Sequence, residues 1–444
     1  MRILVANRAE IACRIIEAIH ATGNEAVAIY SRADKDMKHC EMADLAVCVG
    51  PELGVDSYLN MLAVLTAATS LEVDAIHPGY GFLSENSNFA RLCEELGIKF
   101  IGPSSSCIDL MGDKINALNI MAKASDENNQ FFEITDESQL QTYANKIGLP
   151  VIIKYAQGGG GKGMRIVREF EELNNCYKMV VSEANVMEAN PRIFVEKFIE
   201  NAKHVEVQLL CDDYGNVRTL GTRDCSLQRN GQKIIEEAPA TISSSVETKL
   251  YTIASNIAKE INYSGVGTVE FMVKGENIYF LEMNTRLQVE HTVTEEIFGI
   301  DLVAMQIEVA NGANLTDLDI PETYNGHAIE CRINAEDPTH KFMPSPGTIT
   351  KLEMPSSARY DFGFRAGDTI PPYYDSMIGK VIVKEVNRDL AIGHMVDTLT
   401  HFELEGIKNN VNFNITLLND PVFTENTHDT QYVMANLEQL TGGK

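Results

Sequence analysis

The first hundred residues alternate short apolar runs with longer amphipathic stretches. We expect strands at 3–6, 26–30, 73–76 and 99–101, and helices at 10–21, 61–68 and 89–96. The first and last of these helices end near Gly23 and Gly97, as helix termini commonly do. This alternation predicts a doubly wound α/β domain. No G-x-G-x-x-G pattern follows the first strand, so a dinucleotide site of the usual kind is not indicated.

Beyond residue 113 the pattern changes, because strand-like runs dominate. They lie at 150–154, 192–196, 204–210, 268–273 and 278–283, after a polar stretch at 125–130 that predicts a linker or surface loop. A third unit begins with a strand-like run at 328–333. A chain of 444 residues is long enough for several packed units. We therefore expect three domains, at 1–112, 113–328 and 329–444.

Net charge, apolar run lengths and cysteine spacing argue against several classes of function. The formal net charge is −26, which argues against a nucleic-acid or anionic-membrane surface, since phosphate contacts need clustered Lys and Arg. No apolar run is long enough to span a bilayer, and the run at 3–6 is too short for a signal peptide. The nine cysteines form no C-x-x-C pair, which indicates reduced, mostly buried residues. A soluble cytoplasmic protein is expected.

A glycine-rich segment carries the strongest chemical indication. Residues 151–167 read as an apolar strand, a loop containing Gly158, Gly159, Gly160 and Gly161, and a second strand. Such a tip is almost pure backbone and can donate N–H groups to phosphates. A flexible hairpin would explain the glycines but not the flanking Lys154 and Lys162. We therefore favour phosphate binding. The segment is not a Walker A loop, because no Gly-Lys-Ser/Thr occurs.

A second segment alternates polar and mostly apolar residues. If the chain stays extended, one face presents five polar side chains, namely Glu282, Asn284, Arg286, Gln288 and Glu290. A solvated sheet face is the simpler interpretation, but five different hydrogen-bonding groups in a row favour the wall of a site. With Glu270 from the preceding strand, Glu282 and Asn284 supply hard oxygen ligands suited to Mg²⁺.

A third polar pattern is weaker. Residues 204–208 alternate His204, Glu206 and Gln208 with valines, and Gln228 and Lys233 follow in a polar loop. On spacing alone, these positions are more often surface than site.

Taken together, these segments make the chain resemble the biotin carboxylase family of ATP-grasp enzymes over nearly its whole length. Besides the glycine hairpin, the motifs are ANR at 6–8, HPGYGFLSEN at 77–86, LMGDK at 110–114, RDCS at 223–226, EMNTRLQVEH at 282–291, ECRINAED at 330–337 and PPYYDSMIGK at 371–380. The resemblance implies an α/β ATP-grasp fold with an N-terminal doubly wound domain, a central ATP-grasp domain with a mobile lid at about 126–198, and a C-terminal biotin carboxylase domain.

The resemblance also implies substrates and site residues. ATP, with Mg²⁺ or Mn²⁺, would activate bicarbonate as carboxyphosphate for transfer to biotin. The implied nucleotide-contacting residues are Lys114, Lys154, Gly158, Gly159, Gly160, Gly161, Met164, Glu196, Lys197, Ile199, His204 and Gln228. The implied metal ligands are Glu270, Glu282 and Asn284. The implied bicarbonate and biotin site consists of Lys233, Arg286, Gln288, Val289 and Arg332. Glu290 matches the general base, and Arg332 matches the residue that stabilises the biotin anion.

The resemblance also implies which proteins this chain would act with. No Met-Lys-Met biotin-attachment motif occurs, so we expect biotin on a separate carrier protein and a separate carboxyltransferase. This resembles the stand-alone subunit of a bacterial acetyl-CoA carboxylase in fatty-acid synthesis. A homodimer is implied, with Arg14 at a dimer-contact position. The alternatives are a pyruvate, propionyl-CoA or urea carboxylase subunit, or a non-catalytic nucleotide-binding homologue.

Several departures from the family pattern bear on these alternatives. They are Ala9, the rebuilt segment 124–132, Tyr155, Gly231 and Thr292. None of them removes a proposed catalytic group. We therefore favour an active enzyme over the non-catalytic homologue.

Overall fold

The computed structural model describes residues 1–444 apart from 126, 128–129, 159–162, 189 and 443–444. The N-terminal part is a five-stranded parallel sheet in the order β3-β2-β1-β4-β5. Its strands are β1 (Arg2–Val5), β2 (Glu25–Ser31), β3 (Leu45–Gly50), β4 (Ala75–His77) and β5 (Lys99–Phe100). The predicted doubly wound domain is confirmed, although β3 was not expected.

Helices cover both faces of this sheet because alternate strand residues point to opposite sides. Ile3 and Val5 pack with α1 (Ala9–Ala21), whereas Leu4 packs with α3 (Met61–Ser70) and α4 (Ser87–Glu95). Two further helices belong to this part, α2 (Lys38–Met42) and α5 (Ser105–Gly112).

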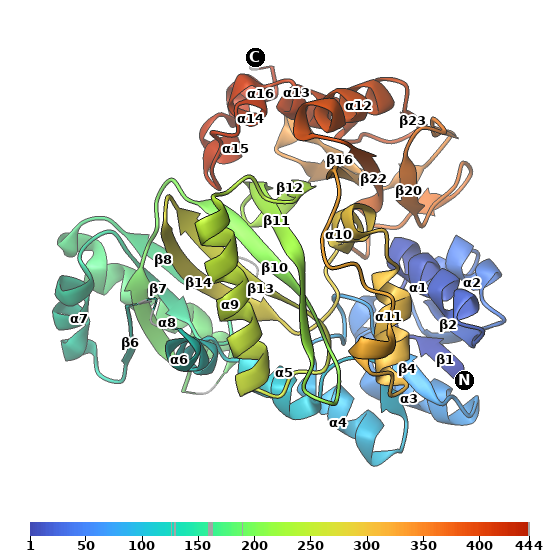
Figure 1. The fold of residues 1–444 in the computed structure, drawn as a ribbon, viewed down its shortest axis with the longest axis horizontal. Coiled ribbons are helices and arrows are strands. Elements are labelled where there is room, and N and C mark those ends of the chain that lie inside the picture. The colour runs from blue at the N-terminus through green and yellow to red at the C-terminus, as the bar shows by residue number, and fades with distance from the viewer. Residues whose placement is uncertain (126, 128–129, 159–162, 189, 443–444) are drawn as a thin grey trace.

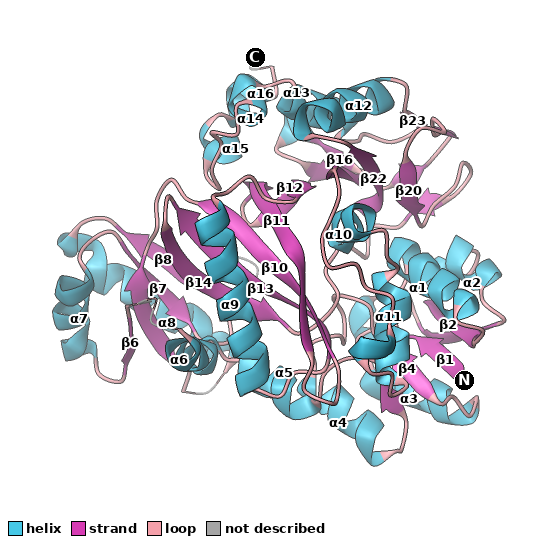
Figure 2. Ribbon diagram, viewed as in Figure 1, coloured by secondary structure: helices cyan, strands magenta, loops and turns pink. Residues whose placement is uncertain are grey.

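An eight-stranded antiparallel sheet runs through the centre of the molecule (Figures 1 and 2). Its order is β14-β13-β10-β11-β12-β15-β22-β20. The strands are β10 (Lys203–Cys211), β11 (Val217–Arg229), β12 (Gln232–Ala238), β13 (Gly265–Lys274), β14 (Asn277–Asn284), β15 (His327–Asn334), β20 (Arg359–Phe362) and β22 (Met377–Glu385). The boundary expected between residues 328 and 329 falls inside β15, which pairs with β12 on one side and β22 on the other.

Period-two alternation gives this sheet one apolar face and one polar face. On β10, Val205, Val207 and Leu209 enter a core with α6 (Lys114–Ala124) and α9 (Ser244–Glu260). The intervening His204 and Glu206 therefore point to the opposite face. Helices α10 (His291–Phe298) and α11 (Leu302–Ala310) follow β14 and connect this sheet to the N-terminal part.

A separate four-stranded sheet lies beside the central one, at the left of Figure 1, in the order β6-β9-β7-β8. It comprises β6 (Phe131–Ile134), β7 (Val151–Tyr155), β8 (Met164–Val167) and β9 (Ile193–Lys197). Helices α7 (Leu140–Ile147) and α8 (Leu173–Met187) cover one of its faces. The predicted glycine hairpin is confirmed, because β7 and β8 pair antiparallel. Its tip at 159–162 lies outside the described residues.

The C-terminal part packs helices onto β15 and β22. These are α12 (Arg388–Thr400), α13 (Val411–Leu418), α14 (Pro421–Thr424), α15 (Tyr432–Ala435) and α16 (Leu437–Leu440). Short strand pairs join β16 (Glu336–Asp337) to β17 (Met343–Pro344), β18 (Gly347–Thr348) to β21 (Thr369–Ile370), and β19 (Lys351–Glu353) to β23 (Glu403–Glu405). Within the described part of the chain, no helix is long and apolar enough to cross a membrane. The nine cysteines are all free thiols.

Candidate active site

Three carboxylates lie side by side across the polar face of the central sheet. Glu206 on β10 pairs in register with Glu270 on β13, and Glu270 pairs with Glu282 on β14. Glu206 and Glu270 are buried. Buried carboxylates are stable only when cations or hydrogen-bond donors face them, so this row indicates a site for positive charge.

Lys233 supplies part of that charge. It follows the β11–β12 turn, and its ammonium donates to Glu206 Oε2 at 2.6 Å, to Glu270 Oε1 at 3.0 Å and to Glu290 Oε1. Burial acts to lower the pKa of Lys233, but Cys225 and the three carboxylates raise it well above its ordinary value. Lys233 is therefore a fixed ammonium at the centre of the site.

Glu290 lies between two cations. Its Oε1 accepts from Lys233, and its Oε2 accepts from Arg332 Nη2 at 2.8 Å. Arg332 also donates from Nε to Glu236 Oε1 at 2.6 Å. Burial acts to raise the pKa of Glu290, but Lys233 and Arg332 outweigh it and hold the pKa well below its ordinary value. Glu290 is therefore ionised, with both of its carboxylate oxygens held by cations.

The segment after β14 departs from the prediction. Strand β14 ends at Asn284, and residues 285–290 form no strand, so the expected extended face from 282 to 290 is wrong. The chain leaves the sheet because Leu287 turns into the core shared with α11, and α10 then begins at His291. The polar side chains still converge, since Gln288 Nε2 donates to Glu270 Oε1 at 2.6 Å.

Neighbouring contacts hold this segment in place. Arg286 Nε donates to Glu85 Oε2 at 2.8 Å, and its Nη2 donates to Asn284 Oδ1 at 2.9 Å. The wholly buried Lys380 donates to the carbonyl oxygen of Val289 at 2.8 Å. The motifs at 77–86 and 371–380 therefore both support the loop that carries Gln288 and Glu290.

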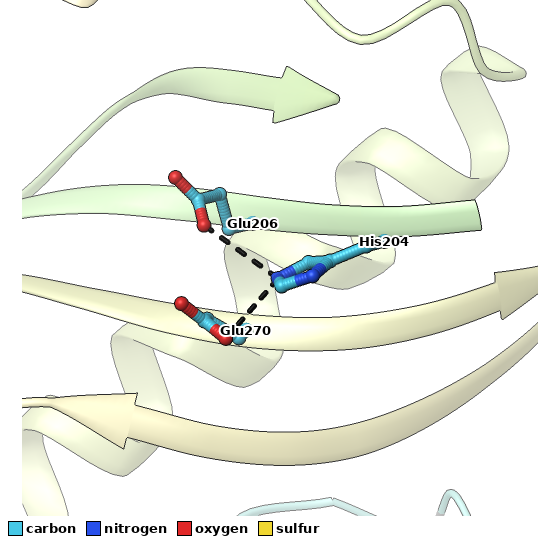
Figure 3. Close-up of side chains that lie close together, drawn as sticks. All are labelled: His204, Glu206 and Glu270. Carbon is cyan, nitrogen blue, oxygen red and sulfur yellow. Dashed lines mark ion pairs between the residues drawn. The ribbon is translucent and has the colours of Figure 1, made fainter. Parts of the chain in front are cut away.

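Possible metal ligands lie on the same face. His204, Glu206 and Glu270 place their ligand atoms within 4.8 Å of one another (Figure 3). Of the expected metal set, Glu270 belongs to this group. The two other members adjoin it, because Glu282 pairs with Glu270 across the strands and Asn284 Nδ2 donates to Glu270 Oε1 at 2.9 Å. This set offers the hard oxygen atoms that Mg²⁺ prefers, so the residues fit the ion.

The residues expected to bind nucleotide divide between two sheets. Lys114 begins α6 and donates to Glu282 Oε2 at 2.7 Å, and the charge of Lys114 lowers the pKa of Glu282 while burial opposes the change. His204 and Gln228 are buried on the central sheet. The remaining described members lie on or beside the smaller sheet, namely Lys154, Gly158, Met164, Glu196, Lys197 and Ile199. Gly159, Gly160 and Gly161 lie outside the described residues.

Three of these side chains on the smaller sheet have structural partners. Lys154 on β7 forms an ion pair with Glu196 on β9. Lys197 Nζ donates to the carbonyl oxygens of Gly148 and Leu149 at 2.9 and 2.8 Å. The side chain of Lys197 therefore supports the fold of the smaller sheet.

The structure corrects a second inference from spacing and adds residues that spacing did not select. Gln228 and Lys233 are not surface residues, because they pair across the β11–β12 hairpin with the Lys233 side chain only 10% exposed. Glu206 and Glu236, which bind Lys233 and Arg332, were not expected as site residues. Glu206 could have been found from the polar alternation along 204–208.

Two departures from the family pattern also have partners. The Tyr155 hydroxyl donates to Glu188 Oε2 at 2.6 Å, which ties β7 to the end of α8. The Thr292 hydroxyl donates to Glu330 Oε2 on β15. Both residues therefore have hydrogen-bond partners in this structure.

Family models match almost the whole chain. They are the biotin carboxylase N-terminal domain over residues 1–108, the carbamoyl-phosphate synthase L chain ATP-binding domain over 113–318, and the biotin carboxylase C-terminal domain over 330–435. With the ATP-grasp architecture described above, these matches place the chain in a class of ATP-dependent ligases. The chain belongs to the biotin carboxylase family.

Individual relatives align with this chain over nearly its whole length. Biotin carboxylase 1 of Bacillus subtilis is 46% identical, and the alignment covers 97% of this chain and 98% of that protein. A biotin carboxylase–β,γ-ATP complex from Campylobacter jejuni has a TM-score of 0.94 at 43% identity, covering 98% of each chain. The biotin carboxylase domain dimer of Hydrogenobacter thermophilus 2-oxoglutarate carboxylase, in complex with MgADP, ADP and bicarbonate, has a TM-score of 0.93 at 41% identity, covering 99% of this chain and 98% of that one.

Proposed function

We propose that this chain uses Mg-ATP and bicarbonate to carboxylate biotin on a separate carrier protein. The observation that carries the proposal is the position of Glu290, which lies ionised between Lys233 and Arg332 and beside the Glu206–Glu270–Glu282 row. A base of this kind can take the proton of bicarbonate, and fixed cations beside it can hold a small oxyanion.

The nucleotide would lie between the two sheets. Lys114 and Lys154 would contact its phosphates, and the hairpin that carries Gly158 to Gly161 would cover them. Met164, Glu196, Lys197, Ile199, His204 and Gln228 complete the proposed set. A cover over the phosphates excludes water, which a short-lived mixed anhydride requires. The relatives' ATP-analogue and ADP complexes support this assignment.

Glu270, Glu282 and Asn284 would hold Mg²⁺ or Mn²⁺. The ion would neutralise charge on the phosphates of the nucleotide. Lys114 already lowers the pKa of Glu282, so that carboxylate is ionised and suited to bind a cation.

The remaining residues would handle bicarbonate and biotin. Lys233, Arg286, Gln288 and Val289 would bind bicarbonate, and Glu290 would accept its proton as the γ-phosphoryl group of ATP is transferred. The carboxyl group of the resulting carboxyphosphate then passes to a ureido nitrogen of biotin, while phosphate leaves and takes the proton of that nitrogen. Arg332 would stabilise the biotin anion, because a planar guanidinium suits a delocalised oxyanion.

We further propose that the chain is the biotin carboxylase subunit of a cytoplasmic acetyl-CoA carboxylase, acting before a carboxyltransferase in malonyl-CoA formation. One of the similar structures belongs to a 2-oxoglutarate carboxylase, so family membership alone does not select the acceptor. We also propose a homodimer, as in that structure. Arg14 would act there indirectly, because its side chain is buried and donates to Glu295 Oε1 and Asp301 Oδ1 at 2.8 and 2.6 Å.

The test is ATP hydrolysis by the purified protein with Mg²⁺ and bicarbonate, with and without free biotin. The expected result is hydrolysis that requires bicarbonate and rises with biotin. A biotinylated carrier protein should raise the rate further. If ATP binds but neither biotin nor the carrier changes the rate, the chain is not a biotin carboxylase, and the non-catalytic alternative would replace it. Adding carboxyltransferases with different acyl-CoA or keto-acid acceptors would then identify the physiological acceptor.

A further inference from the structure

Arg223 is the largest fully buried side chain of the described structure, and the functional assignments above give it no role. It lies on β11 within the RDCS motif at 223–226. A guanidinium has five N–H donors. In this structure it meets five acceptors: Glu206 Oε1 at 2.5 Å, Gln208 Oε1 at 2.5 Å, Thr294 Oγ1 at 3.0 Å, Thr268 Oγ1 at 3.1 Å and Gln288 Oε1 at 2.9 Å.

One of these contacts orients Gln288. Because Arg223 Nη2 binds the amide oxygen of Gln288, the amide nitrogen must point the other way, where it donates to Glu270 Oε1 at 2.6 Å. An amide rotated by half a turn would place its oxygen against the Glu270 carboxylate and its NH₂ against the guanidinium. Both contacts would be repulsive, so Arg223 selects one of the two amide orientations.

A second contact reaches Lys233. Glu206 accepts from Arg223 through Oε1 and from Lys233 through Oε2, so the two cations are held by opposite oxygens of one carboxylate. Lys233 in turn binds Glu290. Arg223 therefore supports the proposed bicarbonate site by two routes, one through Gln288 and one through Glu206 and Lys233.

We propose that Arg223 is a positioning residue for bicarbonate, which fixes the donor face of Gln288 and the place of Lys233 without touching the substrate itself. This inference rests on the proposed function. A role in stability alone would not require this residue type, because well-packed apolar groups replace many buried ion pairs without loss of stability. Nor could a lysine reproduce five directed donors in one plane.

The experiment compares Arg223→Lys and Arg223→Met with wild type and with Thr222→Val. Thr222 is the adjacent residue of β11, is equally buried, and accepts from the amide of Ala240, outside the Arg223 contacts. Steady-state ATP hydrolysis is measured as a function of bicarbonate, ATP and biotin. Thermal unfolding of each variant records the folded fraction.

We expect both Arg223 variants to raise the KM for bicarbonate by roughly 10- to 100-fold, the usual effect of removing a partner that orients a binding residue. The KM for ATP should stay within about twofold. Thr222→Val should lose stability without a change in the KM for bicarbonate.

Two results would overturn the proposal: an unchanged KM for bicarbonate in the folded variants, or a loss of activity that only follows the folded fraction. If neither Arg223 variant folds, Glu206→Gln decides, because it removes the carboxylate whose two oxygens hold Arg223 and Lys233. It should raise the KM for bicarbonate several-fold, and an unchanged KM would refute the positioning of Lys233 by Arg223 through Glu206. A wild-type protein without bicarbonate-dependent hydrolysis would instead refute the proposed function.

Discussion

The forked contact of Arg332 allows a quantitative test of the site. Its Nε donates to Glu236 at 2.6 Å, and its Nη2 donates to Glu290 at 2.8 Å. In the substitution Arg332→Lys, the charge remains but the planar fork is lost. A single ammonium cannot take both positions with the same geometry, so one of the two carboxylates loses its hydrogen bond to residue 332.

The expected fall in kcat follows from the hydrogen bond that Arg332→Lys loses. A hydrogen bond to a charged group contributes about 1.5–3 kcal/mol. Since about 1.4 kcal/mol corresponds to a tenfold change in rate, kcat should fall roughly 10- to 150-fold if the interaction acts in the transition state. The biotin-dependent part of the rate should fall most, because Arg332 is proposed to stabilise the biotin anion. The KM for ATP should not change.

The assay is bicarbonate-dependent ATP hydrolysis with and without free biotin. Arg388→Lys is a matched control, because Arg388 also forms a forked, mostly buried pair, with Glu237 at 2.7 and 3.1 Å, away from Glu290. Both variants should lose a similar amount of stability, and only Arg332→Lys should lose biotin-dependent turnover. Wild-type turnover in Arg332→Lys would refute the proposed role of its guanidinium. If Arg332→Lys and Arg388→Lys lost the same fraction of biotin-dependent turnover, Arg332 would contribute only to stability.

Three further outcomes are expected. Glu290→Gln should retain the KM for ATP but lower kcat by roughly 100- to 10,000-fold, and a near-wild-type rate in steady-state assays would remove Glu290 as the base. Glu282→Gln should raise the concentration of Mg²⁺ needed for half-maximal activity by roughly 10- to 100-fold, and an unchanged metal titration would exclude Glu282 as a ligand. Burial acts to raise the pKa of Asp224, but Lys203 and His428 hold it well below its ordinary value. That carboxylate therefore stabilises the fold above the unfolded pKa of about 4, and its contribution is lost as pH falls. Urea denaturation should show Asp224→Asn less stable than wild type by about 3–5 kcal/mol at pH 7, with a difference that shrinks in acid; a pH-independent difference would contradict this.

The local pattern predicted most strands of the two large sheets and three helices, because it depends on neighbouring residues; β3, α2 and the helices after residue 100 were not expected. The N-terminal strands and helices that were expected lie within two residues of the expected ends. The glycine hairpin was predicted correctly as a strand pair. The prediction was wrong where long-range packing decided the conformation. Residues 285–290 keep a polar–apolar alternation, yet Leu287 is drawn into a core formed with α11, so the strand ends at Asn284.

The sequence by itself determined the family, the strand faces that carry the chemistry, and the types of side chain available. Only the tertiary structure decided which of these side chains meet. Lys233 and Glu290 are 57 residues apart, and Arg332 follows Glu290 by another 42. Their contacts arise because β12 and β15 are neighbours in the central sheet and the 285–290 loop folds back over them. Spacing could not reveal Arg223 as a centre of five contacts, because its acceptors come from β10, β13, the 285–290 loop and α10, which only the folded chain brings together.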